Sequence, residues 1–348
     1  MLPLLAAQAA AAREALSPEV HDYVAGGAGE ETSLAEAEGA WRAHRLRPRV
    51  LRDVSAVDTA TTLLGTPLRT PVLVAPTALH GLLHPGAEAA TAAGTAAAGS
   101  LLVLSTRSSV RLEDAAGAGP WWLQVYVLRD RGLTRALAQR AAAAGASALV
   151  LTGDTPYVGA RRGAPPPRGP EHLANLAQHL VAGVHGDHAV EQDPSVDLGA
   201  VEALAAASGL PVLVKGVLRG DDAVACLDAG AAGVVVSNHG GRQLDRAVST
   251  AHALPEVADA VGGRAPVLVD GGLRSGLDVL TALALGASAV LVGRPVLWAL
   301  AAGGADGVRD CLTALTDDLR DAMALAGAPS LADVGRDLVT PGGRPSPR

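Results

Sequence analysis

Short apolar segments recur along the chain, and each is bounded by glycine, proline or polar residues. Between them lie alanine- and leucine-rich stretches with helical periodicity, such as residues 130–146 and 222–233. Continuous apolar strands that alternate with helices predict a parallel sheet covered on both faces. The eight predicted strands cover residues 71–76, 100–106, 121–127, 147–154, 211–216, 233–238, 266–272 and 288–295.

The number of predicted strands favours one architecture, because eight β/α units close into a barrel. An open, doubly wound sheet is the alternative, in which a site forms only where the strand order reverses. Polar side chains stand at or just after the carboxyl end of each predicted strand, and a barrel would bring them to a single mouth. We therefore predict an α/β fold, a TIM barrel of (β/α)8 type with an N-terminal helical segment. The polar residues at the strand ends are Thr77, Ser105, Gln124, Tyr126, Thr152, Asp154, Lys215, His239, Asp270 and Arg294.

The predicted domain organisation is a single domain over residues 1–348. Residues 1–70 are expected to form an N-terminal helical cap, residues 71–300 the barrel, and residues 301–348 C-terminal helices with a tail. The gap between the fourth and fifth predicted strands is the longest, and residues 163–198 within it show no clear strand. A segment this irregular inside a compact domain is typical of a lid or a mobile loop.

Composition and charge narrow the possible partners. The net charge is −7, from 28 basic and 35 acidic residues without a long basic run, which argues against nucleic acid or an anionic membrane surface. The chain has no stretch apolar and long enough to span a membrane, and its N-terminal apolar stretch lacks the basic region of a signal peptide. Two distant cysteines, Cys226 and Cys311, have no metal-type spacing, which is typical of a reduced, cytoplasmic protein without a metal site.

Two glycine-bearing turns follow the last two predicted strands, DGGLRSG at residues 270–276 and GRPVLW at residues 293–298. Glycine lets backbone amides approach an anion closely, and a following helix N-terminus adds a favourable dipole. In TIM barrels these same two loops commonly build a phosphate site. Because each turn also carries an arginine, Arg274 or Arg294, we predict a phosphorylated ligand or cofactor rather than two ordinary tight turns.

Other strand-end residues have the chemistry of proton transfer. His239 is the best candidate for a general base, because imidazole titrates near neutrality. Asp154, at the end of another predicted strand, could orient the ring and stabilise its protonated form. Arg242 can hold a planar carboxylate with two hydrogen bonds. These residues indicate a small anionic substrate that loses a proton next to its carboxylate. Lys215 could pair with a carboxylate, form a Schiff base or neutralise a developing anion.

The segment SNHGGRQLD, residues 237–245, resembles the signature of the FMN-dependent 2-hydroxy acid oxidases and dehydrogenases, which oxidise glycolate, lactate or mandelate. The likeness extends to HDYVAGGAGEETSLAEAEGAW near the N-terminus and to LQVYVLRDR, LTGDTP, LPVLVKGV, DGGLRSG and VGRP in the barrel. It runs from about residue 15 to 335, with 163–198 unmatched. The resemblance implies FMN as cofactor, a 2-hydroxy acid as substrate, and oxygen or another acceptor for the electrons. It also implies a homo-oligomer, with a tetramer as the expectation.

The resemblance further implies catalytic roles for individual side chains. His239 would be the catalytic base, with Asp154 behind it, and the hydroxyl groups of Tyr23 and Tyr126 would assist at the substrate. The sequence leaves open whether a proton leaves the hydroxyl group together with hydride transfer or leaves the α-carbon first.

Binding roles are implied in the same way. Arg161 and Arg242 would hold the substrate carboxylate, with help from Tyr23 and Tyr126. The spacing from Gly159 favours Arg161 over Arg162 for this role. Lys215 would stabilise negative charge on the reduced flavin. The other implied contacts of FMN are Ala75, Thr77, Ala78, Ser105, Gln124, Thr152, Ser237, Asp270, Gly272, Arg274, Gly293 and Arg294.

The chain departs from the family pattern at two places. The segment VGARRGAPPP becomes proline-rich where the family commonly continues with basic and aromatic residues, and Arg107 stands where the family often has an aromatic residue near the substrate. Arg107 would admit a polar or anionic substrate tail, unless it points to solvent. We predict FMN-dependent oxidation of an L-2-hydroxy acid to the 2-oxo acid. The alternatives are a biosynthetic flavoenzyme that oxidises an amine, a carrier-bound or a peptide-derived substrate, and a ligand-binding barrel with an inactive site.

Overall fold

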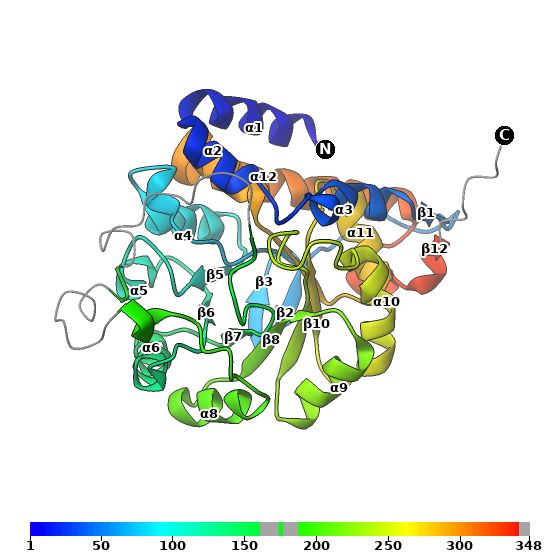
Figure 1. The fold of residues 1–348 in the computed structure, drawn as a ribbon. Helices are drawn as coiled ribbons and strands as arrows, with labels where there is room; N and C mark the ends of the chain where they lie inside the picture. The colour runs from blue at the N-terminus through cyan, green and yellow to red at the C-terminus, as the bar shows by residue number, and fades with distance from the viewer. Residues whose placement is uncertain (161–173, 177–186, 341–348) are drawn as a thin grey trace.

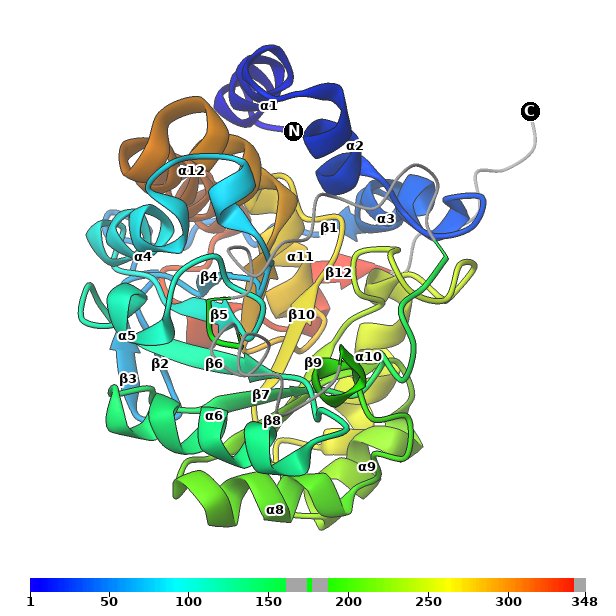
Figure 2. The same cartoon turned by 60° about the vertical axis from the view of Figure 1, so that its left-hand side comes forward.

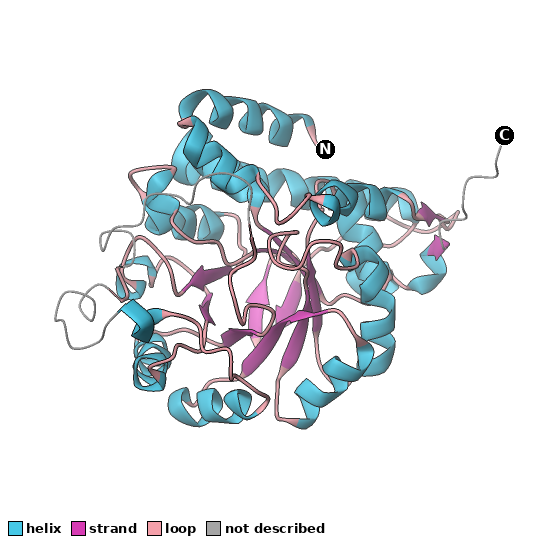
Figure 3. Ribbon diagram, in the orientation of Figure 1, coloured by secondary structure: helices cyan, strands magenta, loops and turns pink. Residues whose placement is uncertain are grey.

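A closed barrel of parallel strands forms the centre of the molecule, in a computed structural model that describes residues 1–160, 174–176 and 187–340. Figure 3 shows these strands in magenta, surrounded by helices. The barrel order is β10-β11-β4-β5-β6-β7-β8-β9, which confirms the predicted TIM barrel and rules out the open sheet. The strands are β4 (Val72–Val74), β5 (Leu102–Ser105), β6 (Trp121–Val125), β7 (Leu149–Thr152), β8 (Val212–Val217), β9 (Gly233–Val236), β10 (Val267–Asp270) and β11 (Ala289–Val292).

The first and last strands of the barrel close it, since β11 pairs in parallel with β4 through Val290 and Val72. All other neighbouring strands of the barrel are parallel too. Their carboxyl ends therefore open at the same face, and side chains distant in sequence meet there.

Helices form an outer ring, and each barrel strand is followed by one of them (Figure 1). The helices cover the outer face of the strands and the side chains inside the barrel cover the inner face, so both faces are buried, as the continuous apolar runs predict. These helices are α4 (Ala87–Ala97), α5 (Leu112–Ala115), α6 (Arg131–Ala143), α8 (Gly199–Ser208), α9 (Gly220–Asp228), α10 (Thr250–Val261), α11 (Gly276–Ala284) and α12 (Arg294–Ala326).

The apolar core has two layers, one inside the barrel and one between the strands and the helices. Leucine, valine and alanine make up most of both, as a chain without phenylalanine requires. The largest side chain inside the barrel is Trp122, which is fully buried and donates its indole N–H to Ser147 Oγ at 3.0 Å. Burial of one leucine or valine side chain stabilises a fold by roughly 1.5–3 kcal/mol. The many buried side chains of the two layers therefore make the barrel a rigid support for its mouth.

Three N-terminal helices lie along one side of the barrel: α1 (Pro3–Ala15), α2 (Pro18–Ala25) and α3 (Thr32–Arg42). Helix α1 packs along α12, as both views show (Figures 1 and 2), and Gln8 Nε2 donates to the carbonyl of Gly307 at 2.9 Å. Ser17 caps α2 by accepting from Val20 N at 3.4 Å. Helix α2 in turn carries Tyr23 to the mouth of the barrel.

Residues before the barrel also contain strands that the sequence pattern did not indicate. A hairpin of β2 (Thr61–Leu63) and β3 (Thr66–Leu68) turns at Gly65, whose φ of 79° suits glycine. Leu63 and Leu68 join the interior cluster together with residues at the starts of barrel strands, so the hairpin covers the end opposite the mouth. The remaining short elements are β1 (Arg45–Leu46), β12 (Val339–Thr340), which pairs with it, and the 3₁₀ turns His80–Leu82, Asp187–Val190, Leu331–Asp333 and Arg336–Leu338.

Several other predictions concern the chain outside the barrel. Most of the predicted lid, residues 163–198, lies outside the described residues; within it the structure gives 174–176 and 187–198. In the described part of the chain no helix has the length and apolar character to cross a membrane. Cys226 and Cys311 are buried free thiols, and burial raises their pKa values to about 11 and about 12, so both stay protonated near neutral pH.

Candidate active site

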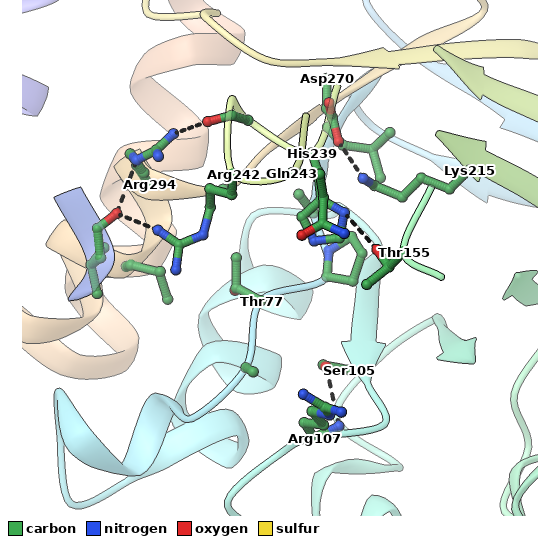
Figure 4. Close-up of a pocket in the computed structure, with 18 of the residues that line it drawn as sticks. Thr77, Ser105, Arg107, Thr155, Lys215, His239, Arg242, Gln243, Asp270 and Arg294 are labelled. Carbon is green, nitrogen blue, oxygen red and sulfur yellow. Dashed lines mark hydrogen bonds and ion pairs between the residues drawn. The ribbon is translucent and has the colours of Figure 1, made fainter. Parts of the chain in front are cut away.

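A cavity of about 740 Å³ opens at the carboxyl ends of the barrel strands (Figure 4). This volume is in the range of small-molecule and cofactor sites. Among the described residues, its walls carry more cations than carboxylates: Arg107, Lys215, Arg242, Arg274 and Arg294 against Glu191 and Asp270. The cavity is therefore suited to anionic ligands.

His239 lies at the mouth, on the loop after β9, and contacts two residues of the loop after β7. Its Nδ1 is 3.0 Å from Asp154 Oδ1 and 3.4 Å from Thr155 Oγ1. The backbone of His239 has φ of 57°, a left-handed conformation that costs free energy in a residue other than glycine. Ser237 Oγ accepts from the His239 amide at 3.0 Å and helps to hold this conformation. Since Nδ1 faces the carboxylate, Nε2 is the ring nitrogen left for a substrate.

Asp154 is the negative partner of this histidine. Burial alone would raise the pKa of Asp154, but the hydrogen bond from His239 and the charges of His239 and Lys215 bring it below its ordinary value. Its Oδ2 is buried and has no hydrogen-bond partner among the described residues. The aspartate is thus an ionised group whose main contact is the imidazole, which fixes the tautomer and orientation of the ring.

Arg242 and Arg294 both reach across to the C-terminal end of α2. Arg242 Nη1 donates to the carbonyls of Tyr23 at 2.8 Å and Gly26 at 2.7 Å, and its guanidinium lies 5.0 Å from the centre of the Tyr23 ring. Arg294 donates to the carbonyls of Val24, Gly26 and Gly240. The negative end of the helix dipole favours both cations, and the two arginines hold the end of α2 that carries Tyr23 at the cavity.

Tyr126 follows β6 and also lines the cavity. Burial raises the pKa of its phenol, which therefore stays protonated and able to donate a hydrogen bond. The guanidinium of Arg107 lies over the Tyr126 ring, 5.2 Å from its centre. Arg107 thus faces the cavity rather than solvent, as the first of the two sequence readings expects.

Lys215 is buried at the end of β8, and two groups surround its ammonium nitrogen. Nζ lies 2.9 Å from Asp270 Oδ2 and donates to Ser237 Oγ at 2.7 Å. Burial lowers the pKa of this lysine, but the charges of Asp270 and Asp154 and the hydrogen bond to Asp270 together outweigh burial and raise it above the ordinary value. Lys215 is therefore a fixed cation, which argues against a Schiff base because that role needs a neutral amine.

Three polar side chains form a hydrogen-bonded chain behind the cavity wall. Ser105 Oγ donates to Gln124 Oε1 at 3.2 Å, and Gln124 Nε2 donates to Thr152 Oγ1 at 2.9 Å. These residues come from the ends of β5, β6 and β7, which are neighbours in the barrel. All three are buried, so the chain presents an ordered polar surface rather than a solvated one.

Residues of the two glycine turns, 270–276 and 293–298, both line the cavity. Gly272 has φ of 80°, and a Cβ there would come within 2.3 Å of the carbonyl oxygen of Ala37. Gly293 precedes the first residue of α12 and borders the same cavity. Arg274 pairs through Nε with Glu38 at 3.1 Å, although burial lowers the pKa of its guanidinium. Backbone amides and cations of the two turns therefore face the cavity.

The structure brings most of the predicted site residues to the cavity wall. Asp154, Gln124, Thr152 and Ser237 stand directly behind it and hold the residues in front. Arg161 lies outside the described residues. The predicted residues that line the cavity are Tyr23, Ala75, Thr77, Ala78, Ser105, Arg107, Tyr126, Lys215, His239, Arg242, Asp270, Gly272, Arg274, Gly293 and Arg294.

Sequence reasoning missed several polar residues of the site, among them Thr155 and Gln243. Thr155 contacts both His239 and Asp154, and its hydroxyl donates to Asp154 Oδ1 at 3.1 Å. Gln243 donates through Nε2 to the carbonyls of Asp154 and Tyr157, at 3.1 and 3.0 Å. Thr155 follows Asp154 and Gln243 follows Arg242, two residues that the sequence did single out. This adjacency was the signal that could have identified them.

Comparison with known proteins agrees with this geometry. The family model described as FMN-dependent dehydrogenase matches residues 12–341. A 4-hydroxymandelate oxidase from Amycolatopsis orientalis is 46% identical, with 94% of this chain and 95% of that protein covered. An L-lactate oxidase from Nostoc sp. is 44% identical, with 93% and 94% covered.

A solved structure shares the fold as well as the sequence. A mandelate oxidase crystallised with (S)-4-hydroxymandelic acid superposes with a TM-score of 0.89 at 44% identity, over 97% of this chain and 98% of that one. The family model and these relatives cover nearly the whole chain. The chain therefore belongs to the FMN-dependent dehydrogenase family.

Proposed function

We propose that this protein oxidises an L-2-hydroxy acid to the corresponding 2-oxo acid with FMN, and that the reduced flavin passes its electrons to oxygen. The observation that carries the proposal is the contact between His239 and Asp154 at the mouth, next to Arg242 and Tyr23. A base beside a guanidinium and a phenol is the arrangement that deprotonation next to a carboxylate needs. The relatives named as lactate and 4-hydroxymandelate oxidases support both the substrate class and oxygen as acceptor.

The described residues fit FMN at two ends of the cavity. Gly272, Gly293 and Arg274 offer backbone amides and positive charge for a phosphate. At the other end Lys215 supplies a fixed cation, which would stabilise negative charge on a reduced flavin ring. Asp270 keeps one buried oxygen, Oδ1, without a hydrogen-bond partner among the described residues, and a hydroxyl of the ribityl chain would satisfy it. We therefore place Ser105, Gln124 and Thr152 at the ring.

Each side chain of the site would have its own role in the reaction. Arg242 would bind the substrate carboxylate, and Tyr23 would donate its phenolic O–H to the same substrate. This would bring C2 and its hydroxyl to His239, whose Nε2 would take the proton. Asp154 would hold the resulting imidazolium in place. FMN would supply the two-electron acceptor. Arg161 is proposed as the second carboxylate ligand from the resemblance alone.

Two further properties are proposed from the resemblance. We expect a homotetramer that acts in the cytoplasm. Size-exclusion chromatography with light scattering would give the mass of the assembly, and a mass equal to that of one chain would contradict this expectation.

An anaerobic screen tests the proposed function. Purified protein with bound flavin is mixed with a panel of L-2-hydroxy acids without oxygen, and the absorbance of the oxidised flavin is followed. We expect at least one acid to bleach the flavin, and admission of air to restore the colour with formation of peroxide. A protein that binds no FMN, or whose flavin no member of the panel bleaches, would contradict the proposal. Bleaching by an amine or a carrier-bound substrate alone would favour the alternative reaction.

A further inference from the structure

A positively charged side chain stands apart from those that the proposed reaction uses. Arg107 follows β5, is half-buried and lines the cavity. Figure 4 shows it beside Ser105, on the other side of the pocket from Arg242 and Arg294. The pocket therefore offers cations at two separate places.

The backbone around Arg107 is held firmly. Its amide donates to Ser105 Oγ at 3.1 Å, and its carbonyl accepts from Leu79 N at 3.2 Å. Two residues further on, Ser109 N donates to the buried Glu88 Oε1 at 2.9 Å, and the same oxygen accepts from His80 N at 3.0 Å. Glu88 thereby ties the loop after β5 to the loop after β4. The guanidinium of Arg107 is thus carried by a backbone segment that hydrogen bonds hold in place.

The side chain of Arg107 reaches over Tyr126 towards the reacting groups. Its guanidinium lies 5.2 Å from the centre of the Tyr126 ring, and Nη2 donates to Gln192 Oε1 at 2.9 Å. The Tyr126 phenol is also within electrostatic reach of Asp154 and Lys215. Arg107 and Tyr126 thus lie in contact with each other in the cavity wall.

We propose that Arg107 binds a second carboxylate, carried on the side chain of the substrate, so that the preferred substrates are 2-hydroxy dicarboxylic acids. This inference rests on the proposed function. A 2-hydroxy acid held at Arg242 with C2 at His239 directs its remaining substituent into the rest of the cavity, where Arg107 forms part of the wall. An aliphatic tail there would lie against a charged group and form no hydrogen bond with it, at a cost. A carboxylate would form charge-assisted hydrogen bonds with the guanidinium.

Matched substrates test this assignment. L-2-Hydroxyglutarate and L-2-hydroxypentanoate have the same number of carbon atoms and differ at the end of the chain, where a carboxylate replaces a methyl group. Anaerobic stopped-flow reduction of the bound flavin gives a limiting rate and an apparent Kd for each. We expect the wild type to prefer the dicarboxylate, and Arg107→Gln to lose about 10- to 100-fold in rate over Kd for it. The same variant should change the value for the neutral acid little, and Arg107→Lys should keep part of the preference.

Binding of the products supplies a readout that does not depend on turnover. Titration with 2-oxoglutarate and with 2-oxopentanoate, followed by the flavin spectrum, should show tighter binding of the dicarboxylate to the wild type only. Arg129→Gln is the matched control, because Arg129 is an exposed arginine near the mouth that pairs with Glu191 and does not line the cavity. This control should leave the discrimination between the two products unchanged.

The outcomes separate the two proposals. Oxidation of both acids with the same discrimination in wild type and Arg107→Gln would overturn the assignment of Arg107 and leave the proposed function standing. In that case Arg107 would only join the loop after β5 to the segment of Gln192. If no 2-hydroxy acid bleached the flavin and neither oxo acid bound, both proposals would fail together.

Discussion

His239 Nδ1 and Asp154 Oδ1 lie 3.0 Å apart although 85 residues separate them in the chain. They stand on the loops after β9 and β7, and β8 lies between these two strands in the barrel. The close approach depends on Gly216 in β8. This residue has φ of 105°, and a side chain at its position would clash with Asp154. The pair is therefore built by three neighbouring strands rather than by a local motif.

Replacing Asp154 by asparagine removes the charge but keeps the shape. The imidazolium then loses its ionic partner, and an amide can select the wrong ring tautomer. We expect flavin reduction to slow by about 10²- to 10⁴-fold, with FMN still bound. Stopped-flow reduction measures the rate, and the control is Asp221→Asn, which alters an exposed aspartate that pairs with Arg219 on the surface. An unchanged rate in Asp154→Asn would show that the carboxylate plays no part.

Replacing Gly216 by alanine tests whether the backbone of β8 holds Asp154 in place. A Cβ at this position would lie 2.5 Å from Asp154 Cβ and 2.6 Å from its Cγ, so the aspartate has to shift. Gly209→Ala is the matched control, because Gly209 also has positive φ, 71°, but a Cβ there meets nothing within 4 Å. Both variants should lose about 1–3 kcal/mol from backbone strain, measured by urea unfolding. Only Gly216→Ala should also slow flavin reduction, and equal activity in the two variants would contradict this prediction.

The buried pair of Lys215 and Asp270 predicts a non-additive effect on stability. Lys215→Met alone leaves a buried carboxylate without its cation, which costs about 3–5 kcal/mol in the free energy of unfolding. The double variant Lys215→Met, Asp270→Leu removes both charges and should recover most of that loss. Urea unfolding of the two single variants and the double variant forms the cycle. Additive losses would show that the two charges do not interact across their 2.9 Å contact.

The shifted pKa values of Asp154 and Lys215 predict how stability depends on pH. Asp154 has a folded pKa below the ordinary value of 3.8, so its contribution is complete above about pH 4 and is lost as pH falls through the folded value. Lys215 has a folded pKa above 10.5, so its contribution is complete below that pH and is lost as pH rises through the folded value. The free energy of unfolding is measured from about pH 3 to about pH 11, a range that the two groups set. The loss of stability at acid pH should be absent in Asp154→Asn. If Asp154→Asn lost as much stability at acid pH as the wild type, the loss would come from other carboxylates.

The barrel was predictable because each strand is a continuous run of valine and leucine that only a doubly covered sheet accommodates. The same pattern missed the hairpin at Gly65, because its strands of three residues are too short to show a period. The strand-end residues were predictable as types, and so was the contact between Asp154 and His239, but the pairing of Lys215 with Asp270 was not. The residue type and position left three roles open for Lys215, the resemblance favoured charge stabilisation at the flavin, and neither indicated Asp270 as its partner at 2.9 Å. The left-handed backbone of His239 was also hidden, because histidine gives no signal for positive φ.

The reductive half-reaction of wild type and His239→Gln tests the central claim most directly. Both proteins, loaded with FMN, are mixed without oxygen with an L-2-hydroxy acid that bleaches the wild type, and flavin absorbance is recorded. The account predicts fast bleaching of the wild type, and an unbleached flavin that remains bound in His239→Gln, because glutamine has no group that accepts the proton. Bleaching of His239→Gln at the rate of the wild type would contradict the account.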